Sequence, residues 1–434
     1  MTETHRRPAD PVVAWTIVIA AVLRVLSVVG LRSYRYVDSI DYETLDFTGG
    51  SRRPWVTPLL YWLVGDDPTR IFAQAVLGAL CWSLLAAEVA LHVEHRWTRR
   101  AAVGAVALLG ASTAITNWDT TILSESLAIS ATALAAAAYL RFGRVRSLSA
   151  ALGAVGATLL WVFTRQNHLV LLGLVVGAVL VVVAVARWRT HRWDRPLLVL
   201  GGGLVLVAVL AGASYGQNTE IREFNLAMVI GQRVITDPER LAWFEDAGMP
   251  LPDAAVPGQL IFPEPLLEDA EFRAWVQEEG SGTYARFLLT HPWFALTEPL
   301  DDFVADQESW LDEPRGDDVM LATPDPYGST RQLVPEQLER LVFDPGNSGT
   351  VVVALAAVLA ATIHRWRRSG WDRRWLVPLA MIGLQWPALT VVWHASTAEL
   401  GRLALVSALL LRIGMIVQAA LVADGWFGDR HVGA

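Results

Sequence analysis

Long runs of apolar residues, separated by short polar segments, make up most of the chain. An α-helix needs roughly 20 such residues to cross the hydrocarbon core of a bilayer, and in lipid only helices or closed barrels satisfy their own backbone. The runs are continuous and rich in Ala, Leu and Val, without the two-residue alternation of a barrel strand. We therefore predict about ten transmembrane helices, over residues 11–31, 70–93, 101–117, 121–140, 149–164, 167–186, 196–214, 349–363, 375–393 and 400–423.

The polar connections between these runs divide into two kinds. Every second one is rich in Arg, with three or more in each of residues 95–100, 141–146, 187–195 and 364–374. Because cytoplasmic loops carry an excess of basic residues, this alternation predicts that both termini are cytoplasmic. We interpret the first run as an uncleaved span rather than a signal peptide, because it is long, contains Arg24 and is followed by no small-x-small cleavage site.

One connection, residues 215–345, is far longer than the rest and is predicted to lie outside. It contains 26 acidic residues and 8 Arg, against 17 acids and 27 Arg elsewhere. Such an acidic domain argues against nucleic acid as a partner. Its Pro, Asp and Gly residues predict helices over 239–247, 265–279 and near 283–292, the first starting after Asp237-Pro238 and stopping at Gly248.

We therefore predict an all-α polytopic membrane protein with three parts. These are N-terminal spans (1–214) that include a first outer loop (32–69), the helical loop domain (215–345) and C-terminal spans (346–434). Composition agrees, since 53% of the 434 residues are hydrophobic. All 35 basic residues are Arg, which with the Ala-rich runs suggests a GC-rich bacterial genome, and the single Cys81 excludes an intrachain disulfide.

The first outer loop is rich in carboxylates. Asp38, Asp41, Glu43 and Asp46 follow the first span directly. Carboxylates at a membrane surface are often simply solvated. Alternatively, one of them is an ion ligand or a general base, which must lie within reach of the hydroxyl that it activates.

Three further sites bring charge to the outer ends of spans. Glu125 begins or enters the fourth span, where it either complements a helix dipole or serves a functional site, since ionisable groups in lipid are costly. Arg165 lies at an outer turn, where it either snorkels or binds a lipid-linked phosphate. Glu399 and Arg402, after His394, stand three residues apart and either pair with each other or bind phosphate.

Several short motifs resemble the GT-C superfamily of polyprenyl-phosphate-sugar-dependent membrane glycosyltransferases, such as protein O-mannosyltransferase-like and aminoarabinose-transferase-like enzymes. The first outer loop carries the similar stretches Asp38-Ser39-x-x-Tyr42, Arg53-Pro54 and Pro58-Leu59-Leu60. The others are Thr121-x-x-Ser124-Glu125-x-Leu127, and His394 followed by Glu399-x-x-Arg402, where Leu403 replaces the family's His.

The resemblance implies a GT-C-like fold in which Asp38 is the base, with Asp41 as the substitute candidate. It also implies that Tyr42, Arg53, Glu125, Arg165, His394, Glu399 and Arg402 bind substrate or lipid phosphate. Some members use a divalent cation, which Asp38 and Asp41 would hold, but the chain has no metal-ligand cluster of firm spacing and no P-loop, Rossmann or zinc motif.

Two functional interpretations follow. The first is an inverting glycosyltransferase that moves a sugar from a polyprenyl-phosphate donor to a glycan, lipid or protein acceptor at the outer face of the bacterial cytoplasmic membrane. The alternative is a transporter or flippase of lipid-linked or anionic solutes, which predicts ionisable residues near the bilayer midplane. A non-catalytic scaffold for envelope assembly stays open as a third.

Overall fold

The computed structural model describes residues 10–47, 53–215, 219–259, 261–304, 329–342, 348–397 and 400–429. These residues form helices joined by loops, and the only strand-like pairing among them is the isolated bridge between Tyr34 and Thr121. Within these described ranges, eight helices are long and apolar enough to cross a membrane, or nine if the bent pair α4 and α5–η2 is one span. The protein is therefore a multi-pass membrane protein.

The ten predicted runs each correspond to a helix or a consecutive pair of helices. The run 101–117 bends by 47° after Ala111, and the run 149–164 forms the shorter apolar helix α7. The helices of the bundle are α1 (Pro11–Val28), α3 (Asp67–His92), α4 (Arg96–Ala111), α5 (Thr113–Thr116), η2 (Asn117–Thr120), α6 (Glu125–Val145), α7 (Leu148–Val162), α8 (His168–Thr190), α9 (Arg195–Tyr215), α17 (Ser348–Ser369), η5 (Arg373–Trp375), α18 (Leu376–Gly383), α19 (Gln385–Ala395) and α20 (Leu400–Asp429).

Polar residues at the helix starts explain several of these boundaries. Asp10 accepts a hydrogen bond from the Val12 amide with Pro11 as the first helical residue, and Asp66 accepts one from Thr69 at the start of α3. A side-chain acceptor at this position satisfies an amide that has no partner within the helix. Caps therefore fix the starts of α1 and α3.

Two helices form the centre of the bundle. In α20 and α6, 89% and 72% of the apolar window is buried, against 11% in α8 and 6% in α17. The α6 helix is rich in Ala and Ser, which lets neighbouring backbones approach closely, and it packs on α3, α7, α18 and α20. Because α8 and α17 are apolar yet exposed, they present their side chains to lipid.

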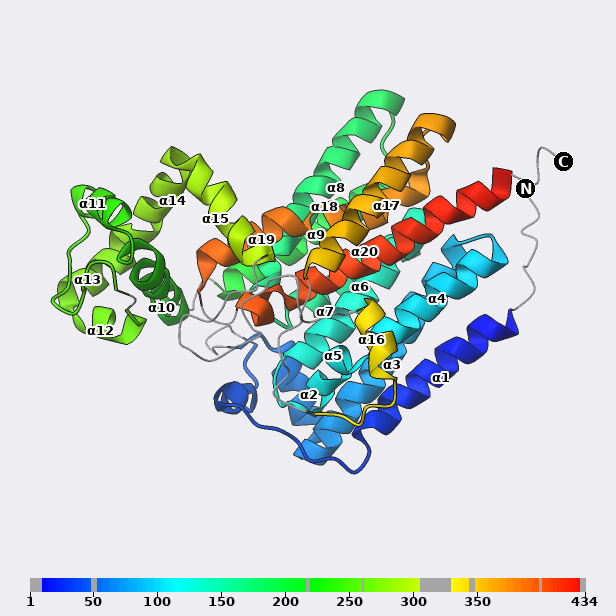
Figure 1. Cartoon of the computed structure of the whole chain (residues 1–434), viewed down its shortest axis with the longest axis horizontal. Coiled ribbons are helices and arrows are strands. Elements are labelled where there is room, and N and C mark those ends of the chain that lie inside the picture. Colours follow the sequence, from blue (N-terminus) through cyan, green and yellow to red (C-terminus); the bar gives the residue numbers. More distant parts are fainter. Residues whose placement is uncertain are drawn as a thin grey trace.

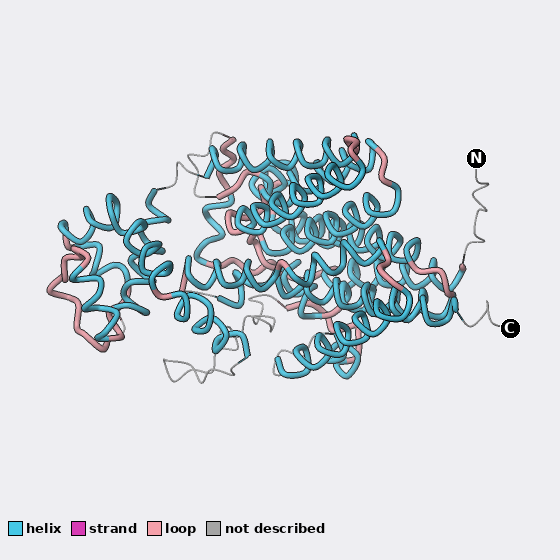
Figure 2. Tube along the Cα trace, turned by 90° about the horizontal axis from the view of Figure 1, so that it is seen from above, coloured by secondary structure: helices cyan, strands magenta, loops and turns pink. Residues whose placement is uncertain are grey.

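The long connection forms a small helical domain, called here the loop domain (residues 219–304). Figure 1 shows it at one end of the molecule, and the view in Figure 2 shows the same protrusion from the bundle. Its aromatic core includes Phe244, Phe272, Trp275 and Phe287. Its elements are α10 (Thr219–Val229), η3 (Ile230–Val234), α11 (Pro238–Asp246), α12 (Pro263–Glu268), α13 (Ala270–Trp275), η4 (Val276–Gly280), α14 (Ser281–Thr290) and α15 (Pro292–Val304).

Two predicted helices of the loop domain are confirmed and one is broken. Asp237 caps α11 by accepting from the amides of Glu239 and Arg240, and Gly248 follows with φ of +94°. The predicted helix over 265–279 is interrupted at Asp269, whose side chain accepts from the Phe272 amide and starts α13 instead. A second cap inside this segment therefore divides what the flanking Pro and Gly predict to be one helix.

Residues 329–342 lie against the bundle. Arg331 donates its amide to the carbonyl of Ser27, and Glu339, in α16 (Glu336–Val342), accepts from Thr113 at the start of α5. The described parts of the predicted 215–345 domain thus occupy two places, the loop domain and the ends of α1 and α4. The division into three sequence domains stays a prediction.

The four Arg-rich turns lie together at one end of the bundle. Arg100 pairs with Asp10 at 3.0 Å, Arg146 with Asp194 at 3.3 Å, and Arg374 with Asp424 at 3.2 Å. These pairs join the start of α1, the turns and the end of α20, which Figure 1 places away from the loop domain. Acid–base pairs thus hold the Arg-rich end of the bundle together.

Candidate functional site

A cavity of about 460 Å³ lies where the bundle meets the loop domain. One wall is the first outer loop, with Asp38 and Arg53, and another is the turn before α8, with Arg165. The α10 helix of the loop domain contributes Phe224 and Asn225. This volume lies in the usual range for a small-ligand site.

Arg53 holds two carboxylates of the first outer loop. Its Nη2 lies 3.0 Å from Asp38 Oδ2 and 3.2 Å from Asp41 Oδ2. These residues lie in or beside η1 (Val37–Tyr42) and just before α2 (Val56–Val64). Although burial alone would lower the pKa of Arg53, the negative charges around it raise that pKa above its usual value, so the guanidinium stays charged.

Glu125 holds two more guanidinium groups at the start of α6. Its side chain is fully buried and pairs with Arg402 Nε and, at 3.2 Å, with Arg165 Nη1. A buried carboxylate needs such partners because an unpaired charge there is costly. Glu125 is therefore more than a residue that complements a helix dipole.

Arg402 joins the two groups into one cluster. Its Nη2 lies 3.4 Å from Asp38 Oδ2, while its Nε binds Glu125. The Arg165 guanidinium also donates to the Arg402 carbonyl at 3.2 Å. We call the set Asp38, Asp41, Arg53, Glu125, Arg165 and Arg402 the ion-paired cluster, in which three carboxylates balance three guanidinium groups.

Tyr42 connects this cluster to the start of α6. Its hydroxyl donates to Ser124 Oγ at 3.0 Å, and the Arg53 guanidinium lies 5.2 Å from the centre of its ring. Cation–π contact of this kind favours a fixed guanidinium position. The Tyr42 side chain is thus part of the support for Arg53.

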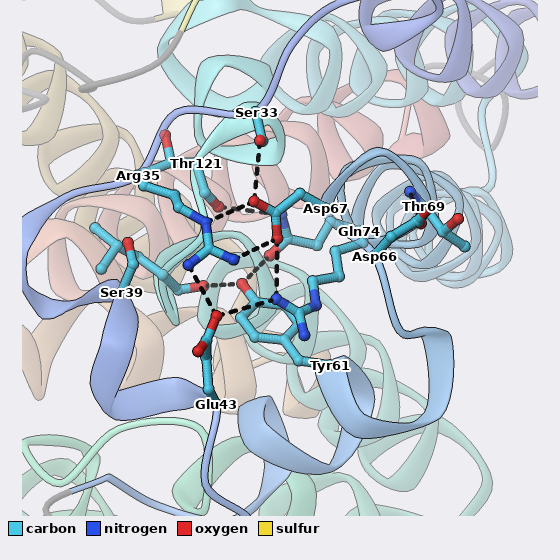
Figure 3. Close-up of polar contacts among 12 residues, drawn as sticks. Ser33, Arg35, Ser39, Glu43, Tyr61, Asp66, Asp67, Thr69, Gln74 and Thr121 are labelled. Atoms are coloured by element: carbon cyan, nitrogen blue, oxygen red, sulfur yellow. Dashed lines mark hydrogen bonds and ion pairs between the residues drawn. The ribbon is translucent and has the colours of Figure 1, made fainter.

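Beside the cluster, a second network ties the first outer loop to α3 (Figure 3). Asp67 accepts from Ser33 Oγ at 3.2 Å, from Arg35 Nε at 2.6 Å and from Arg70 Nη1 at 2.9 Å. Arg35 also pairs with Glu43 at 2.8 Å. Glu43 therefore lies in this surface network and not among the carboxylates of the cavity.

A second chamber, of about 350 Å³, adjoins the first. Residues Gln166, Ile221, Asn225 and Ala395 line both. His394 lies in this chamber and not in the ion-paired cluster, with its ring nitrogens 2.9 Å from Tyr284 Oη and 2.9 Å from the Ala295 carbonyl. Of the other predicted site residues, Glu399 lies outside the described residues, so its pairing with Arg402 stays a prediction.

The sequence predicts only one partner of a buried ion pair near the start of α6. Arg24 donates to both oxygens of Asp119, at 2.9 and 2.8 Å, and Ser126 donates to the same carboxylate at 2.6 Å. The ionisable Arg24 within an apolar run was visible, but Asp119 was not singled out. This pair fixes α1 against the turn before α6 and so supports Glu125.

No metal site is formed by the described residues, in that no three His, Cys, Asp or Glu side chains gather to hold an ion. Asp38 and Asp41 instead share the positive charge of Arg53.

No protein-family model and no curated protein sequence matches the chain. Among solved structures it is similar to the Archaeoglobus fulgidus oligosaccharyltransferase AglB in complex with an inhibitory peptide and a dolichol-phosphate, with 14% identity and a TM-score of 0.43. It is also similar to the Archaeoglobus fulgidus oligosaccharyltransferase in its apo form, with 13% identity and a TM-score of 0.44. The form tethered with an acceptor peptide containing the NVT sequon has 12% identity and a TM-score of 0.46. Each match covers 97% of this chain and 50–51% of the archaeal chain, so this chain spans about half the length of those proteins.

Proposed function

We propose that the protein is an inverting membrane glycosyltransferase at the outer face of the bacterial cytoplasmic membrane. The donor is a polyprenyl-phosphate-linked sugar and the acceptor a glycan, lipid or protein. The observation that carries the proposal is the ion-paired cluster, where Asp38 lies between two guanidinium groups at a cavity that Arg165 also lines. It brings together a candidate base and cations suited to a phosphate.

In this reaction the acceptor hydroxyl attacks the anomeric carbon of the donor sugar. A C–O bond forms to the acceptor as the bond from the anomeric carbon to the phosphate oxygen breaks, and the electron pair leaves with the phosphate. Asp38 takes the hydroxyl proton. Arginine binds phosphate oxygens through paired hydrogen bonds, so Arg165 and Arg402 stabilise the charge that builds on the leaving group.

Glu125 has a positioning role in this mechanism. Its carboxylate contacts both Arg165 and Arg402. Fixed donors cost no reorganisation during the reaction. We therefore assign Glu125 to holding the guanidinium groups where the phosphate arrives.

The transporter alternative predicts ionisable groups near the bilayer midplane that line a pathway. Arg412 is deep in α20, about 15 Å beyond Arg402 at 1.5 Å per residue. It is buried, donates to the Ala408 carbonyl and lines neither cavity described above. The charges at the cavity gather at the span ends, which favours the enzyme.

The test measures transfer of radiolabelled sugar from polyprenyl-phosphate donors in membranes that contain wild-type protein or Asp38→Asn. Because a general base contributes about 10²–10⁴-fold, we expect transfer by Asp38→Asn to fall by that order. Asp46→Asn, in the same loop but outside the ion-paired cluster, is the matched control. Equal transfer by wild type and Asp38→Asn would remove Asp38 from the role of base.

A further inference from the structure

The second chamber differs in chemistry from the cavity of the ion-paired cluster. The amides of Gln166 and Asn225 and the hydroxyls of Ser281 and Tyr284 contribute to its lining. Among the described residues that line it, Arg222 brings a positive charge and none is Asp or Glu. The chamber therefore offers hydrogen-bonding groups without a carboxylate to bind a basic ligand.

The hydrogen bonds of His394 define the state of Tyr284. The Ala295 carbonyl can only accept, so His394 Nε2 donates to it and His394 Nδ1 accepts from the Tyr284 hydroxyl. Burial raises the pKa of Tyr284 to about 12, which keeps this phenol protonated near neutral pH. Its oxygen therefore presents acceptor lone pairs at the chamber.

Groups that both donate and accept suit a ligand with many hydroxyls, each of which also donates and accepts. The Tyr215 ring in the same lining offers an apolar face against which a sugar ring packs. We infer that the second chamber is an acceptor subsite for a carbohydrate without basic groups. This inference rests on the proposed glycosyltransferase function and names its acceptor class.

The position of the chamber agrees with this role. Gln166 and Asn225 line both cavities, so a ligand in the chamber lies next to the cavity that Asp38 lines. Gln166 directly follows Arg165, which the mechanism places on the donor phosphate. Donor and acceptor would thus meet at one turn of the chain.

Saturation-transfer difference NMR on the full chain in lipid nanodiscs tests the inference. The probes are uncharged methyl disaccharides of glucose, galactose, mannose and arabinose, compared with an acetylated and amidated Ala-Ser-Ala tripeptide. We expect at least one disaccharide to bind and Asn225→Ala to weaken it about three- to tenfold, the loss of one hydrogen bond. Gln277→Ala, an exposed amide elsewhere in the loop domain, is expected to bind as wild type does.

Other outcomes overturn the inference. Binding of the tripeptide but of no disaccharide would assign a protein acceptor, and binding unaffected by Asn225→Ala in a protein of wild-type melting temperature would exclude the chamber. If Asn225→Ala unfolds, Ser281→Ala serves in its place.

Arg165→Ala separates the two proposals, because it is expected to retain disaccharide binding while it weakens donor use. If the wild-type chain binds a disaccharide but Asp38→Asn transfers sugar as fast as wild type, the carbohydrate subsite is supported and the proposed reaction is contradicted.

A different observation concerns α15 of the loop domain. Trp293, Leu296 and Leu300 recur at helical spacing on one face and are 79%, 54% and 42% exposed. The opposite face packs on the end of α19, with Phe294 5.9 Å from the Trp393 ring. Figure 1 shows α15 beside α19 at the junction with the bundle.

We propose that the apolar face of α15 inserts into the lipid surface at this end of the bundle. It lies level with the last turn of α19, where that span leaves the membrane, and Trp is favoured at such interfaces. Amphipathic helices bind there by burying their apolar face among acyl chains. The bilayer would then hold the loop domain over the cavity.

Cysteine labelling tests this proposal, because Cys81 is the only native cysteine. In a Cys81→Ser background, the fluorophore NBD is attached at Leu296→Cys or at Val256→Cys, an exposed control in the α11–α12 connection. In nanodiscs we expect blue-shifted emission, quenched by brominated phosphatidylcholine, only at Leu296→Cys. Equal emission and quenching at both positions would overturn the proposal.

Discussion

At the scale of single residues, Glu125 is a buried carboxylate that two guanidinium groups depend on for their charge balance. It is a fully buried carboxylate whose charge is balanced by two guanidinium groups from distant parts of the chain. Paired buried charges contribute little net stability, but removal of one partner leaves the others uncompensated. The structure therefore predicts a strong effect for a small change at this position.

Glu125→Gln keeps the size of the side chain and removes its charge. We expect a loss of about 3–5 kcal/mol in the free energy of unfolding, the range for breaking a buried ion pair, seen as a lower melting temperature in detergent. Glu245→Gln, an exposed carboxylate on α11, is the control and is expected to melt as wild type does. Unchanged melting of Glu125→Gln would show that Arg165 and Arg402 do not need this carboxylate.

Arg53→Lys tests the geometry of the first outer loop. Lysine keeps the positive charge but loses the planar fork with which Arg53 contacts Asp38 and Asp41. Because misplacing a reacting group by about 1 Å costs on the order of 10²-fold in rate, we expect transfer to fall by that order with little change in melting. Arg32→Lys, on the exposed start of the same loop, should transfer normally, and equal rates for both variants would contradict the assignment.

At the scale of elements, the sequence predicted what local patterns determine. Asp237, Pro238 and Gly248 defined the bounds of α11, and the apolar runs located every span. The break at Asp269 was missed because a capping residue and an ordinary helical acid look alike among several other acidic residues. Arg24 and Asp119 are 95 residues apart, so their pairing depends on how α1 packs against α3 and η2 and not on either local pattern.

The α1–α3 contact provides a test of this packing. A Cβ atom added at Gly78 would overlap the guanidinium of Arg24, whereas one added at Gly104 meets nothing. Gly78→Ala should therefore displace Arg24 from Asp119 and lower the free energy of unfolding by about 3 kcal/mol or more. Gly104→Ala should instead stabilise α4 by up to about 1 kcal/mol. Denaturant unfolding in one detergent compares the free energies of unfolding of the two variants. If both variants are more stable than wild type, the Arg24 guanidinium does not lie against Gly78.

At the scale of the whole molecule, charge divides the protein into two ends. The Arg-rich turns are joined by ion pairs at one end, and the acidic loop domain and the ion-paired cluster lie at the other. The positive-inside rule predicts that the Arg-rich end is cytoplasmic. The proposed donor site, the acceptor chamber and the apolar face of α15 would then all face outward.

This sidedness is the last prediction, and the proposed reaction depends on it. In a Cys81→Ser background, a membrane-impermeant maleimide added to intact cells should label Gln277→Cys in the loop domain. Arg192→Cys, in the α8–α9 turn, should react only after the membrane is opened. Charged labels do not cross the hydrocarbon core, so the two sites report opposite faces. The reverse pattern would put Asp38 and the cavity on the cytoplasmic side, where the acceptor would have to be a cytoplasmic molecule and the proposed envelope function would fail.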